Sequence, residues 1–384
     1  MFNADLIGAQ VYQDWPLHYD PLLPQTVTDP DGTVKTLNTG VRILENGDVV
    51  FTIYAPAVKQ VQVTSKAFNF ELTKQDDGTF TGTLPWDPIK AGPHSFDYIL
   101  DGACFLDPYA PISWHRNRPV NYIDIPDPET PYIHVQDVPH GSVTREIYWS
   151  QAMNRYERCI VYTPPGYMKG TDSYPVLYLQ HGMTENEVTW EFNGRVSSIM
   201  DNGIAAGEIV PFIIVMNNGM IRYKSGERAF TDKAFGDNLL GSCIPYIEEH
   251  YRVKTGPENR AMAGLSMGST QSSLIGLTHP EIFSAIGLFS GFMRAVYDDS
   301  PESLAHLAGL KDPEQFAKDF KVFFRAVGDK DNLKERFAMD DTLCARYGID
   351  KLPNYHRYIY ANQFHEFGAW RRALHDFAPL LFRW

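Results

Sequence analysis

The chain contains 384 residues, of which 43% are hydrophobic and 13% aromatic, and its 34 basic and 47 acidic side chains give a net charge of −13. This length and composition predict a folded globular protein with two domains and well-packed cores. The negative charge argues against a nucleic acid or an anionic membrane as the main partner, because both would repel the chain.

The cysteines and the N-terminal segment narrow the class further. Four cysteines lie far apart without a C-x-x-C pair, which favours free buried thiols over a zinc site or a disulfide framework: Cys104, Cys159, Cys243 and Cys344. No apolar stretch is long enough to cross a bilayer, and residues 1–10 lack the basic start and apolar core of a signal peptide. As written, the sequence predicts a cytoplasmic protein, or a secreted one if a signal peptide has been removed.

The first part of the chain is predicted to be all-β. Residues 1–40 are rich in proline with little periodicity, which predicts an arm laid over other structure. From residue 41 to 107, short runs alternate between apolar and polar residues and are separated by turns such as Asp77-Gly78. This spacing, without a helical pattern, predicts an antiparallel β-sandwich over 41–107. The expected strands are 49–54, 61–64, 71–74, 79–84 and 96–100.

Three stretches of this region carry a family resemblance: F-T-I-Y-A-P-A-V-K-Q-V-Q-V (51–63), D-D-G-T-F-T-G-T (76–83) and G-P-H-S-F-D-Y-I-L-D-G (92–102). They resemble the immunoglobulin-like early-set modules related to family 48 carbohydrate-binding modules. The resemblance implies a sandwich that either holds a glycan or braces its neighbour. Phe68, Phe70 and Trp86 could form a sugar-stacking platform, but aromatic residues in a small sandwich belong more often to its core, and we favour the core.

The next segment is dense in proline. Seven prolines lie between residues 108 and 139. Such density is unfavourable for long helices and for central strands. It predicts a surface linker over 108–140.

From residue 141 to 384 the pattern changes to apolar strands that alternate with helical periodicity. This alternation predicts an α/β domain, with a mostly parallel sheet covered by helices on both faces. The expected strands are 158–163, 175–180, 211–216, 260–263, 285–289, 321–327 and 355–360. The expected helices are 188–202, 237–251, 267–278, 332–347 and 366–382.

One stretch of this domain, 261–272, contains a G-x-S-x-G motif formed by Gly264, Ser266 and Gly268. It lies between a predicted strand and a predicted helix. In that context the motif is typical of a nucleophile elbow, in which the serine hydroxyl is exposed on a tight turn at the end of a strand. We therefore predict that Ser266 is a nucleophile.

Two further polar positions follow predicted strands. Asp331 comes after 321–327 in V-G-D-K-D, with Asp329 as an alternative, and His365 comes after 355–360 in N-Q-F-H-E-F. Ligands bind beyond the carboxyl ends of the strands in such sheets, and the chain order Ser, Asp, His is that of α/β-hydrolases. A serine hydroxyl needs an imidazole to accept its proton, and the imidazole needs a carboxylate to orient it. We predict a Ser266–His365–Asp331 triad, although an aspartate at position 331 could also cap the next helix.

An oxyanion hole is expected beside the serine. The strand at 175–180 ends in His181-Gly182, where a backbone N–H can point towards a substrate carbonyl next to that of Met267. We predict Met183 and Met267 as the donors. His181, Trp190 and Tyr223 are the candidate substrate contacts, and for His181 we favour a loop histidine that holds the turn.

Six stretches in order carry a second resemblance: R-C-I-V-Y-T-P-P-G-Y (158–167), Y-P-V-L-Y-L-Q-H-G-M-T-E-N-E-V-T-W (174–190), I-P-Y-I-E-E-H-Y (244–251), A-G-L-S-M-G-S-T-Q (263–271), V-G-D-K-D (327–331) and F-H-E-F-G-A-W (364–370). They are similar to the family 1 carbohydrate esterases of the esterase D type. The resemblance implies an α/β-hydrolase fold and ester hydrolysis by Ser266, Asp331 and His365. It also implies feruloyl groups on plant xylan as the leading substrate. Ser269 departs from many relatives, which carry glycine there.

Several alternatives stay open. The resembled family also contains acetyl-ester hydrolases such as acetyl-xylan esterases, acyltransferases and siderophore (enterobactin-type) esterases. In the loop 217–235, apolar and aromatic residues suit an aromatic acid, whereas four basic residues could attract an anionic iron complex: Arg222, Lys224, Arg228 and Lys233. The net charge favours the aromatic ester. The segment 292–320 is a candidate cap over the site.

The remaining motifs argue against other classes of protein. The chain contains no H-E-x-x-H, P-loop or dinucleotide fingerprint, so the sequence predicts no metal or other cofactor. A non-catalytic glycan-binding protein is the alternative from another class. An intact serine, aspartate and histidine in the expected order argue against it.

Overall fold

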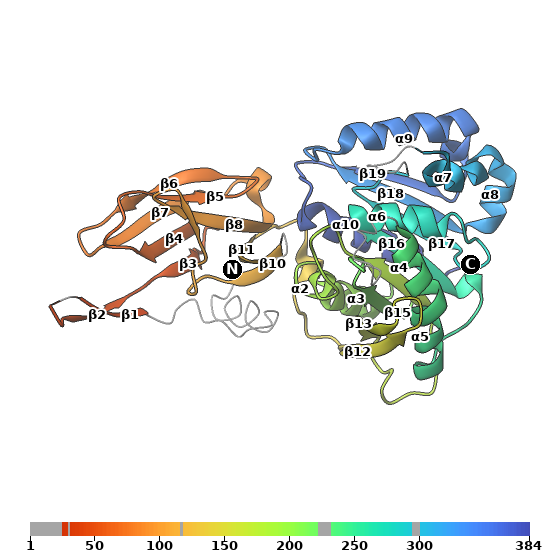
Figure 1. Ribbon diagram of the computed structural model, residues 1–384, viewed down its shortest axis with the longest axis horizontal. Coiled ribbons are helices and arrows are strands. Elements are labelled where there is room, and N and C mark those ends of the chain that lie inside the picture. Colours follow the sequence, from red (N-terminus) through yellow and green to blue (C-terminus); the bar gives the residue numbers. More distant parts are fainter. Residues whose placement is uncertain (1–24, 30, 116–117, 222–231, 294–299) are drawn as a thin grey trace. The chain divides into compact units, whose positions relative to one another are not determined.

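The structure is a computed structural model that describes residues 25–29, 31–115, 118–221, 232–293 and 300–384. The chain forms two compact units (Figure 1). The N-terminal unit comprises Met1–Val135 with Glu366–Gly368, and the C-terminal unit comprises Gln136–His365 and Ala369–Trp384. Of the predicted arm over 1–40, residues 1–24 and 30 lie outside the described residues.

The N-terminal unit is an antiparallel β structure in two layers, as predicted. Its main sheet has the strand order β10-β11-β8-β5-β6-β7-β4-β3. The strand β6 joins the layers, because its residues 69–72 pair with β5 and its residues 73–74 pair with β7. The strands are β3 (Gly40–Ile43), β4 (Val49–Tyr54), β5 (Val61–Thr64), β6 (Asn69–Lys74), β7 (Thr79–Leu84), β8 (Gly92–Leu100), β9 (Ala103–Phe105), β10 (Ile112–His115) and β11 (Arg118–Ile125).

The core of this unit lies between the two layers. Alternate residues of β4, including Phe51, are buried against residues from β5, β8 and β11. Phe68 belongs to this core, and Phe70 and Trp86 pack against it. The three aromatic residues therefore contribute to the packing of the sandwich, as we favoured, Phe68 within the core and the half-buried Phe70 and Trp86 against it.

Two segments differ from the prediction. The described part of the predicted arm contains a hairpin of β1 (Gln25–Thr28) and β2 (Val34–Leu37). Residues 112–115 and 118–125, predicted as linker, form β10 and β11, and β11 pairs on both sides. The strand tolerates Pro119 because the pairing with β8 begins only at Asn121, so at Pro119 one side of the strand needs no hydrogen bond.

The C-terminal unit has an eight-stranded sheet with the order β12-β13-β15-β14-β16-β17-β18-β19. The pairs from β15 to β19 are parallel, and β12 and β13 are antiparallel. The strands are β12 (Ser142–Ser150), β13 (Arg155–Thr163), β14 (Val176–Gln180), β15 (Ile213–Asn217), β16 (Arg260–Leu265), β17 (Ala285–Phe289), β18 (Val322–Gly328) and β19 (Tyr355–Tyr360). The mostly parallel sheet is therefore confirmed.

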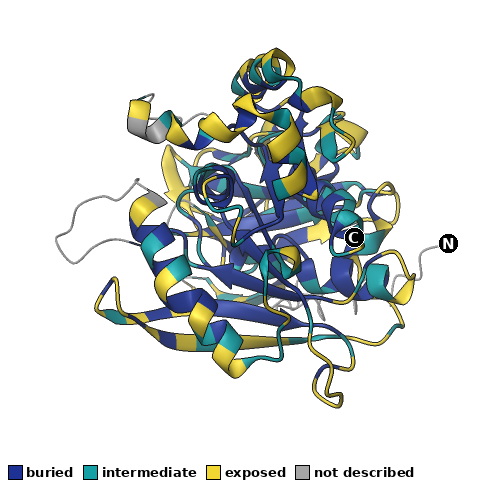
Figure 2. Cartoon of the chain, turned by 90° about the vertical axis from the view of Figure 1, so that its right-hand side faces the viewer, coloured by how far each residue is buried: buried dark blue, intermediate teal, exposed yellow. Residues whose placement is uncertain are grey.

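Helices cover both faces of this sheet. The neighbouring residues Phe323 and Phe324 of β18 point to opposite faces, where they contact Phe316 and Phe377 respectively. The central strands β14, β15, β17 and β18 are consequently buried along their length, and Figure 2 shows them as the dark centre of the unit. The helices are α2 (Thr189–Phe192), α3 (Val196–Ala205), α4 (Asp232–Asn238), α5 (Ile244–His250), α6 (Met267–Gln271), α7 (Pro301–Leu304), α8 (Pro313–Asp319), α9 (Lys334–Tyr347) and α10 (Phe367–Phe377).

Several of the predicted helices are irregular, and the one expected over 267–278 continues from α6 into a π-helical turn at Ser272–Gly276. The helix expected over 188–202 is divided into α2 and α3 at Arg195, which has a φ of 58°. The helix expected over 237–251 starts earlier and continues from α4 to α5 through a π-helical turn at Leu239–Cys243. Local backbone strain of this kind leaves no trace in hydrophobic periodicity.

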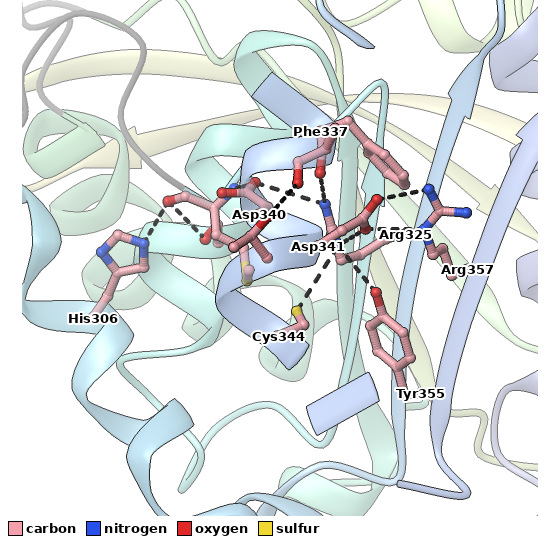
Figure 3. Close-up of polar contacts among 12 residues, drawn as sticks. His306, Arg325, Phe337, Asp340, Asp341, Cys344, Tyr355 and Arg357 are labelled. Carbon is pink, nitrogen blue, oxygen red and sulfur yellow. Dashed lines mark hydrogen bonds and ion pairs between the residues drawn. The ribbon is translucent and has the colours of Figure 1, made fainter. Parts of the chain in front are cut away.

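A polar cluster is buried at the side of the sheet that carries α9 (Figure 3). The side chain of Arg325 on β18 has no exposed surface, and its guanidinium donates to Asp341 Oδ1 at 2.8 Å, Tyr355 Oη at 3.0 Å and the carbonyl of Phe337 at 2.9 Å. Asp340 in turn accepts from the backbone N–H of Met293 at 2.5 Å. The cluster therefore ties β18, β19, α9 and the chain after β17 together.

Two properties of the described residues bear on the cysteines and on membranes. Cys104 is exposed, whereas Cys159, Cys243 and Cys344 are buried free thiols. Within the described ranges, no helix has the length and apolar character needed to cross a bilayer.

Candidate active site

Ser266 lies on the tight turn that joins β16 to α6. Its backbone, at φ 50° and ψ −114°, occupies a region that side-chain-bearing residues rarely adopt. The flanking glycines permit this turn. A Cβ on Gly264 would lie 2.5 Å from the carbonyl carbon of Gly268, and a Cβ on Gly268 would lie 2.6 Å from the carbonyl oxygen of His181. The G-x-S-x-G motif thus reflects two close backbone approaches around a strained serine.

His365 follows β19 and faces the serine. The Ser266 hydroxyl lies 2.9 Å from His365 Nε2 and can donate to it. The imidazole packs edge-on against Trp370, with ring centroids 5.1 Å apart and planes at 88°. The side chain of His365 keeps 16% of its surface exposed, so a substrate can reach the ring while its orientation is fixed.

Asp331 follows β18 and holds the other nitrogen of the imidazole. His365 Nδ1 lies 2.9 Å from Asp331 Oδ2. The carboxylate also accepts from the Ser290 hydroxyl at 2.6 Å and from the backbone N–H of Leu333 at 2.8 Å. Burial alone would raise the pKa of Asp331, but these hydrogen bonds and the neighbouring His365 outweigh it and lower the pKa below its usual value.

The alternative carboxylate, Asp329, does not take this place. Its oxygen lies 3.7 Å from Lys330 Nζ, and its backbone N–H donates to Tyr360. Asp331 also accepts a hydrogen bond from the Leu333 N–H and so caps the following turn. This is the capping role that the sequence allowed as an alternative. Capping and orientation of the histidine are therefore combined in one side chain.

The loop after β14 lies against the serine. A Cβ on Gly182 would be 3.4 Å from Ser266 Cβ, and the Gly182 N–H donates to Glu185 Oε2 at 2.9 Å. Met183 follows directly in this loop. Met267 is the first residue of α6, where a backbone N–H has no acceptor within its own helix. The structure thus brings the two predicted amide donors to the neighbourhood of Ser266, and their role stays a prediction.

Two of the three predicted substrate contacts, His181 and Trp190, are buried. His181 is fully buried, with Nδ1 donating to the Gly182 carbonyl at 2.7 Å and Nε2 accepting from the Gly219 N–H at 2.8 Å. Burial lowers its pKa to about 4, so the ring is neutral. Trp190 is buried too, and its Nε1 donates to the Gln180 carbonyl at 2.8 Å. This geometry fits the turn-holding role that we favoured for His181 and argues against a substrate contact through Trp190 Nε1, because the polar atoms of both side chains bond to backbone.

Other predicted residues lie outside the described part of the chain. These are the third candidate contact, Tyr223, and the basic residues of its loop except Lys233. Lys233 is exposed and pairs with Asp237 at 3.0 Å, as a solvated charge does. Of the predicted cap over 292–320, residues 294–299 are not described, and the rest contains α7 and α8.

Sequence reasoning missed the group that supports Asp331. Ser290 follows β17 with a φ of 47°, and its hydroxyl accepts from Trp370 Nε1 at 2.7 Å while it donates to Asp331. A serine directly after a predicted strand was the available signal, but the adjacency of that strand to the strand of Asp331 appears only in the structure. No three described histidine, cysteine, aspartate or glutamate side chains gather where they could hold a metal ion.

Comparison with known proteins places this geometry among esterases. The family model described as "Putative esterase" matches residues 150–376. An endo-1,4-beta-xylanase/feruloyl esterase from Xylanibacter ruminicola is 35% identical over 375 residues, covering 95% of this chain and 48% of that protein. The chain thus spans about half the length of this curated relative.

Solved structures with a similar fold also include esterases. A ferulic acid esterase is 26% identical, with a TM-score of 0.53 and coverage of 64% of this chain and 98% of that chain. The enterobactin esterase from Shigella flexneri has a TM-score of 0.64 and covers 93% of this chain and 96% of its own, at 14% identity. That identity supports a shared fold alone.

Proposed function

The chain belongs to the esterase family, and from this premise we propose that it is a serine carboxylic-ester hydrolase that releases ferulate from feruloylated xylan or xylo-oligosaccharides. One observation carries the proposal. Ser266 Oγ, the His365 imidazole and the Asp331 carboxylate form a continuous relay with distances of 2.9 Å on either side of the ring. This is the arrangement that activates a serine for acyl transfer.

The geometry supports a two-step reaction. Ser266 Oγ attacks the ester carbonyl carbon while His365 Nε2 takes up the hydroxyl proton, and backbone N–H groups of Met267 and Met183 donate to the oxyanion. His365 then gives the proton to the departing sugar oxygen as its bond to the acyl carbon breaks. Water, deprotonated by the same nitrogen, attacks the acyl-enzyme. Ferulate leaves and the proton returns to Ser266.

The relatives support the acyl group and the polymer. The Xylanibacter ruminicola protein is named for both xylanase and feruloyl esterase activity, and a second relative, 30% identical over 142 residues, is the endo-1,4-beta-xylanase Y of Acetivibrio thermocellus. A solved ferulic acid esterase adds the same chemistry. We therefore propose a plant cell-wall polysaccharide ester as the substrate.

One observation favours a second candidate. The enterobactin esterase of Shigella flexneri aligns with 93% of this chain, a larger share than the 64% of the ferulic acid esterase. A siderophore lactone is cleaved by the same attack on an ester carbonyl. The enterobactin esterase is 14% identical to this chain, whereas the xylanase/feruloyl esterase is 35% identical. We therefore prefer ferulate as the acyl group.

Turnover of methyl ferulate by the Ser266→Ala variant tests the mechanism. We expect kcat to fall at least about a thousandfold, because the nucleophile is removed. Ser269→Ala is the matched control, since this serine of the same elbow is buried and its hydroxyl has no hydrogen-bond partner among the described residues. Substantial turnover by Ser266→Ala would exclude the assignment.

A substrate comparison tests the acyl group. The wild-type protein is given a feruloylated arabinoxylan oligosaccharide and, separately, a catechol-serine trilactone. We expect the higher kcat/KM on the oligosaccharide. A preference for the trilactone would replace the proposed substrate with a siderophore while leaving the triad in place.

A further inference from the structure

Two aromatic side chains lie exposed on the hairpin of β12 and β13. Trp149 and Tyr156 are directly opposite each other in the strand register, and their ring centroids are 5.2 Å apart with planes at 79°. Trp149 is 48% exposed and Tyr156 is 68% exposed. We call this pair the hairpin platform.

The platform is a feature of the solvent face. The flanking residues Tyr148 and Glu157 are buried, so the alternation of the strands directs Trp149 and Tyr156 outward. Large aromatic side chains contribute much more to stability when they are buried, and contiguous apolar side chains exposed to solvent are typical of binding surfaces. The sandwich core and the sheet core do not use either ring.

The strand register places the platform at the same edge of the sheet as Ser266. Cys159 of β13 pairs with Asn217, which is in line with Gln180 and Gly264 on the next strands. Because β13 is antiparallel to β15, the C-terminal direction of β15, β14 and β16 runs towards lower residue numbers on β13. In this direction Tyr156 lies three residues beyond the row, and Ser266 lies two residues beyond it. Since β15 and β14 separate β13 from β16, the lateral offset is about 14 Å at the usual strand spacing.

One ion pair links the strand of the platform to the loop beside Ser266. Arg158, two residues after Tyr156, pairs with Glu187 at 3.0 Å. Glu187 ends the segment that begins at Gly182, whose backbone lies against Ser266. The platform is therefore linked by neighbouring residues to the loop that we propose to carry an oxyanion donor.

The charges beside the platform favour an uncharged ligand. Arg158 is neutralised by Glu187, and Arg155 pairs with Glu157 at 2.6 Å. Both arginines beside the platform are thus engaged, and the net charge of −13 further disfavours a phosphate or sulfate polymer. The faces of aromatic rings attract the C–H groups of a pyranose ring, and the Tyr156 hydroxyl can hydrogen-bond to a sugar hydroxyl.

From these observations we infer that Trp149 and Tyr156 form a carbohydrate-binding subsite for the neutral main chain of the polysaccharide, separate from the triad. The inference rests on the proposed function for the identity of the polymer. A sugar chain that spans the offset between the two places would bind at the hairpin platform while its feruloyl branch reacts at Ser266. Small esters are too short to use the subsite.

The double variant Trp149→Ala/Tyr156→Ala tests the inference in the full chain. On methyl ferulate, we expect kcat and KM to match the wild type. On feruloylated arabinoxylan, we expect KM to rise at least fivefold with little change in kcat. The matched control is Trp384→Ala, which removes a tryptophan of similar exposure, 44%. Its Nε1 donates to the carbonyl of Glu258, which precedes the N-terminal end of β16, whereas Ser266 follows the C-terminal end.

Binding without turnover separates the subsite from the proposed function. Affinity electrophoresis in unsubstituted xylan with Ser266→Ala should show retardation, and adding the two platform substitutions should abolish it. Retardation in xylan that needs Trp149 and Tyr156 would support the subsite even if no feruloyl ester were hydrolysed. Equal KM on polymer and equal retardation for wild type and double variant would overturn it. A change from oligomer to monomer in the double variant, without loss of retardation, would overturn it in favour of a protein interface.

Discussion

Ser290 supports the orientation of the triad from outside its three members. It lies between Trp370 and Asp331, accepting a hydrogen bond from the indole and donating one to the carboxylate. Because a hydroxyl donor stabilises the charged form of a carboxylate, Ser290 contributes to the lowered pKa of Asp331. It acts on the reaction through Asp331, as a positioning residue.

Ser290→Ala should lower kcat about tenfold on methyl ferulate with little change in KM, since a hydrogen bond to a charged group contributes about 1.5–3 kcal/mol. Without this donor, the pKa of Asp331 rises, so the acid side of the kcat profile should move to higher pH. Trp370→Phe is the control, because it leaves the contact of Ser290 with Asp331 intact. A lower kcat with an unmoved pH profile would indicate a merely structural role for Ser290.

His181 provides a pH dependence of stability. The folded protein holds its pKa at about 4, below the value of 6.5 for a free imidazole, because the ring is buried and its Nε2 accepts a backbone hydrogen bond. The unfolded chain therefore binds a proton between pH 6.5 and 4 that the folded chain does not. Folding stability is complete above this range and falls as the pH decreases through it.

The corresponding measurement compares wild type with His181→Gln in chemical denaturation at pH 7 and at pH 4. Glutamine does not titrate, so the stability advantage of the wild type should shrink by about 3 kcal/mol at the lower pH. A constant difference between the two proteins would mean that His181 is not held neutral in the folded state.

The three residues of the relay could be predicted because each follows a strand that periodicity marks clearly. The structure brings Ser266, His365 and Asp331 together, and their catalytic roles stay predictions that the Ser266→Ala experiment tests. Ser290 was missed because its contact with Asp331 depends on the adjacency of β17 and β18, which no local pattern encodes. The turn-holding role favoured for His181 fits the structure, whereas the burial of Trp190 was not predicted because proximity to a motif does not reveal burial.

At the scale of elements, the Arg325 cluster holds β18, β19 and α9 in place. Arg325→Ala would remove the guanidinium and leave Asp341 and the Phe337 carbonyl without their buried partner. Truncating one member of a buried ionic network costs about 3–5 kcal/mol of unfolding free energy. Arg357→Ala is the matched control, since Arg357 contacts the same Asp341 at 2.6 Å but is 36% exposed, and exposed pairs contribute about 1 kcal/mol or less.

Denaturant unfolding of the two variants checks this prediction. A loss for Arg325→Ala no larger than that for Arg357→Ala would show that the buried cluster does not stabilise the unit. Asp340 of α9 also contacts Arg325 and accepts a hydrogen bond from the backbone of Met293. The Arg325 variant therefore also tests whether the chain after β17 is held in position by α9.

Four of the five strands predicted with the correct limits have apolar residues that mark a buried face, and the exception is β19. β4, β5, β7, β17 and β19 have the predicted limits. β12 was not predicted, because apolar residues such as Ile147 and Trp149 lie on its solvent face and obscure the alternation. β10 and β11 were missed because proline density was read as a linker, although a proline at a position with one-sided pairing is compatible with a strand.

At the scale of the whole molecule, each unit has a hydrophobic cluster of its own. The triad residues and both predicted oxyanion donors belong to the C-terminal unit. Because a unit with its own core can fold alone, residues 136–384 should give a soluble protein with a kcat on methyl ferulate within about threefold of the full chain. Circular dichroism and turnover check this, and an aggregated or inactive product would contradict it.

The exposed thiol of Cys104 has a practical consequence for such measurements. Partial desolvation of the sulfur and the neighbouring Asp97 carboxylate raise the pKa of this thiol. Alkylation should therefore proceed faster at mildly alkaline pH. The sulfurs of the other three cysteines are buried and so shielded in the native protein. A single maleimide fluorophore would then label the N-terminal unit alone. Its emission during denaturation would follow the melting of that unit separately from the loss of ester cleavage in its neighbour, without any engineered reporter.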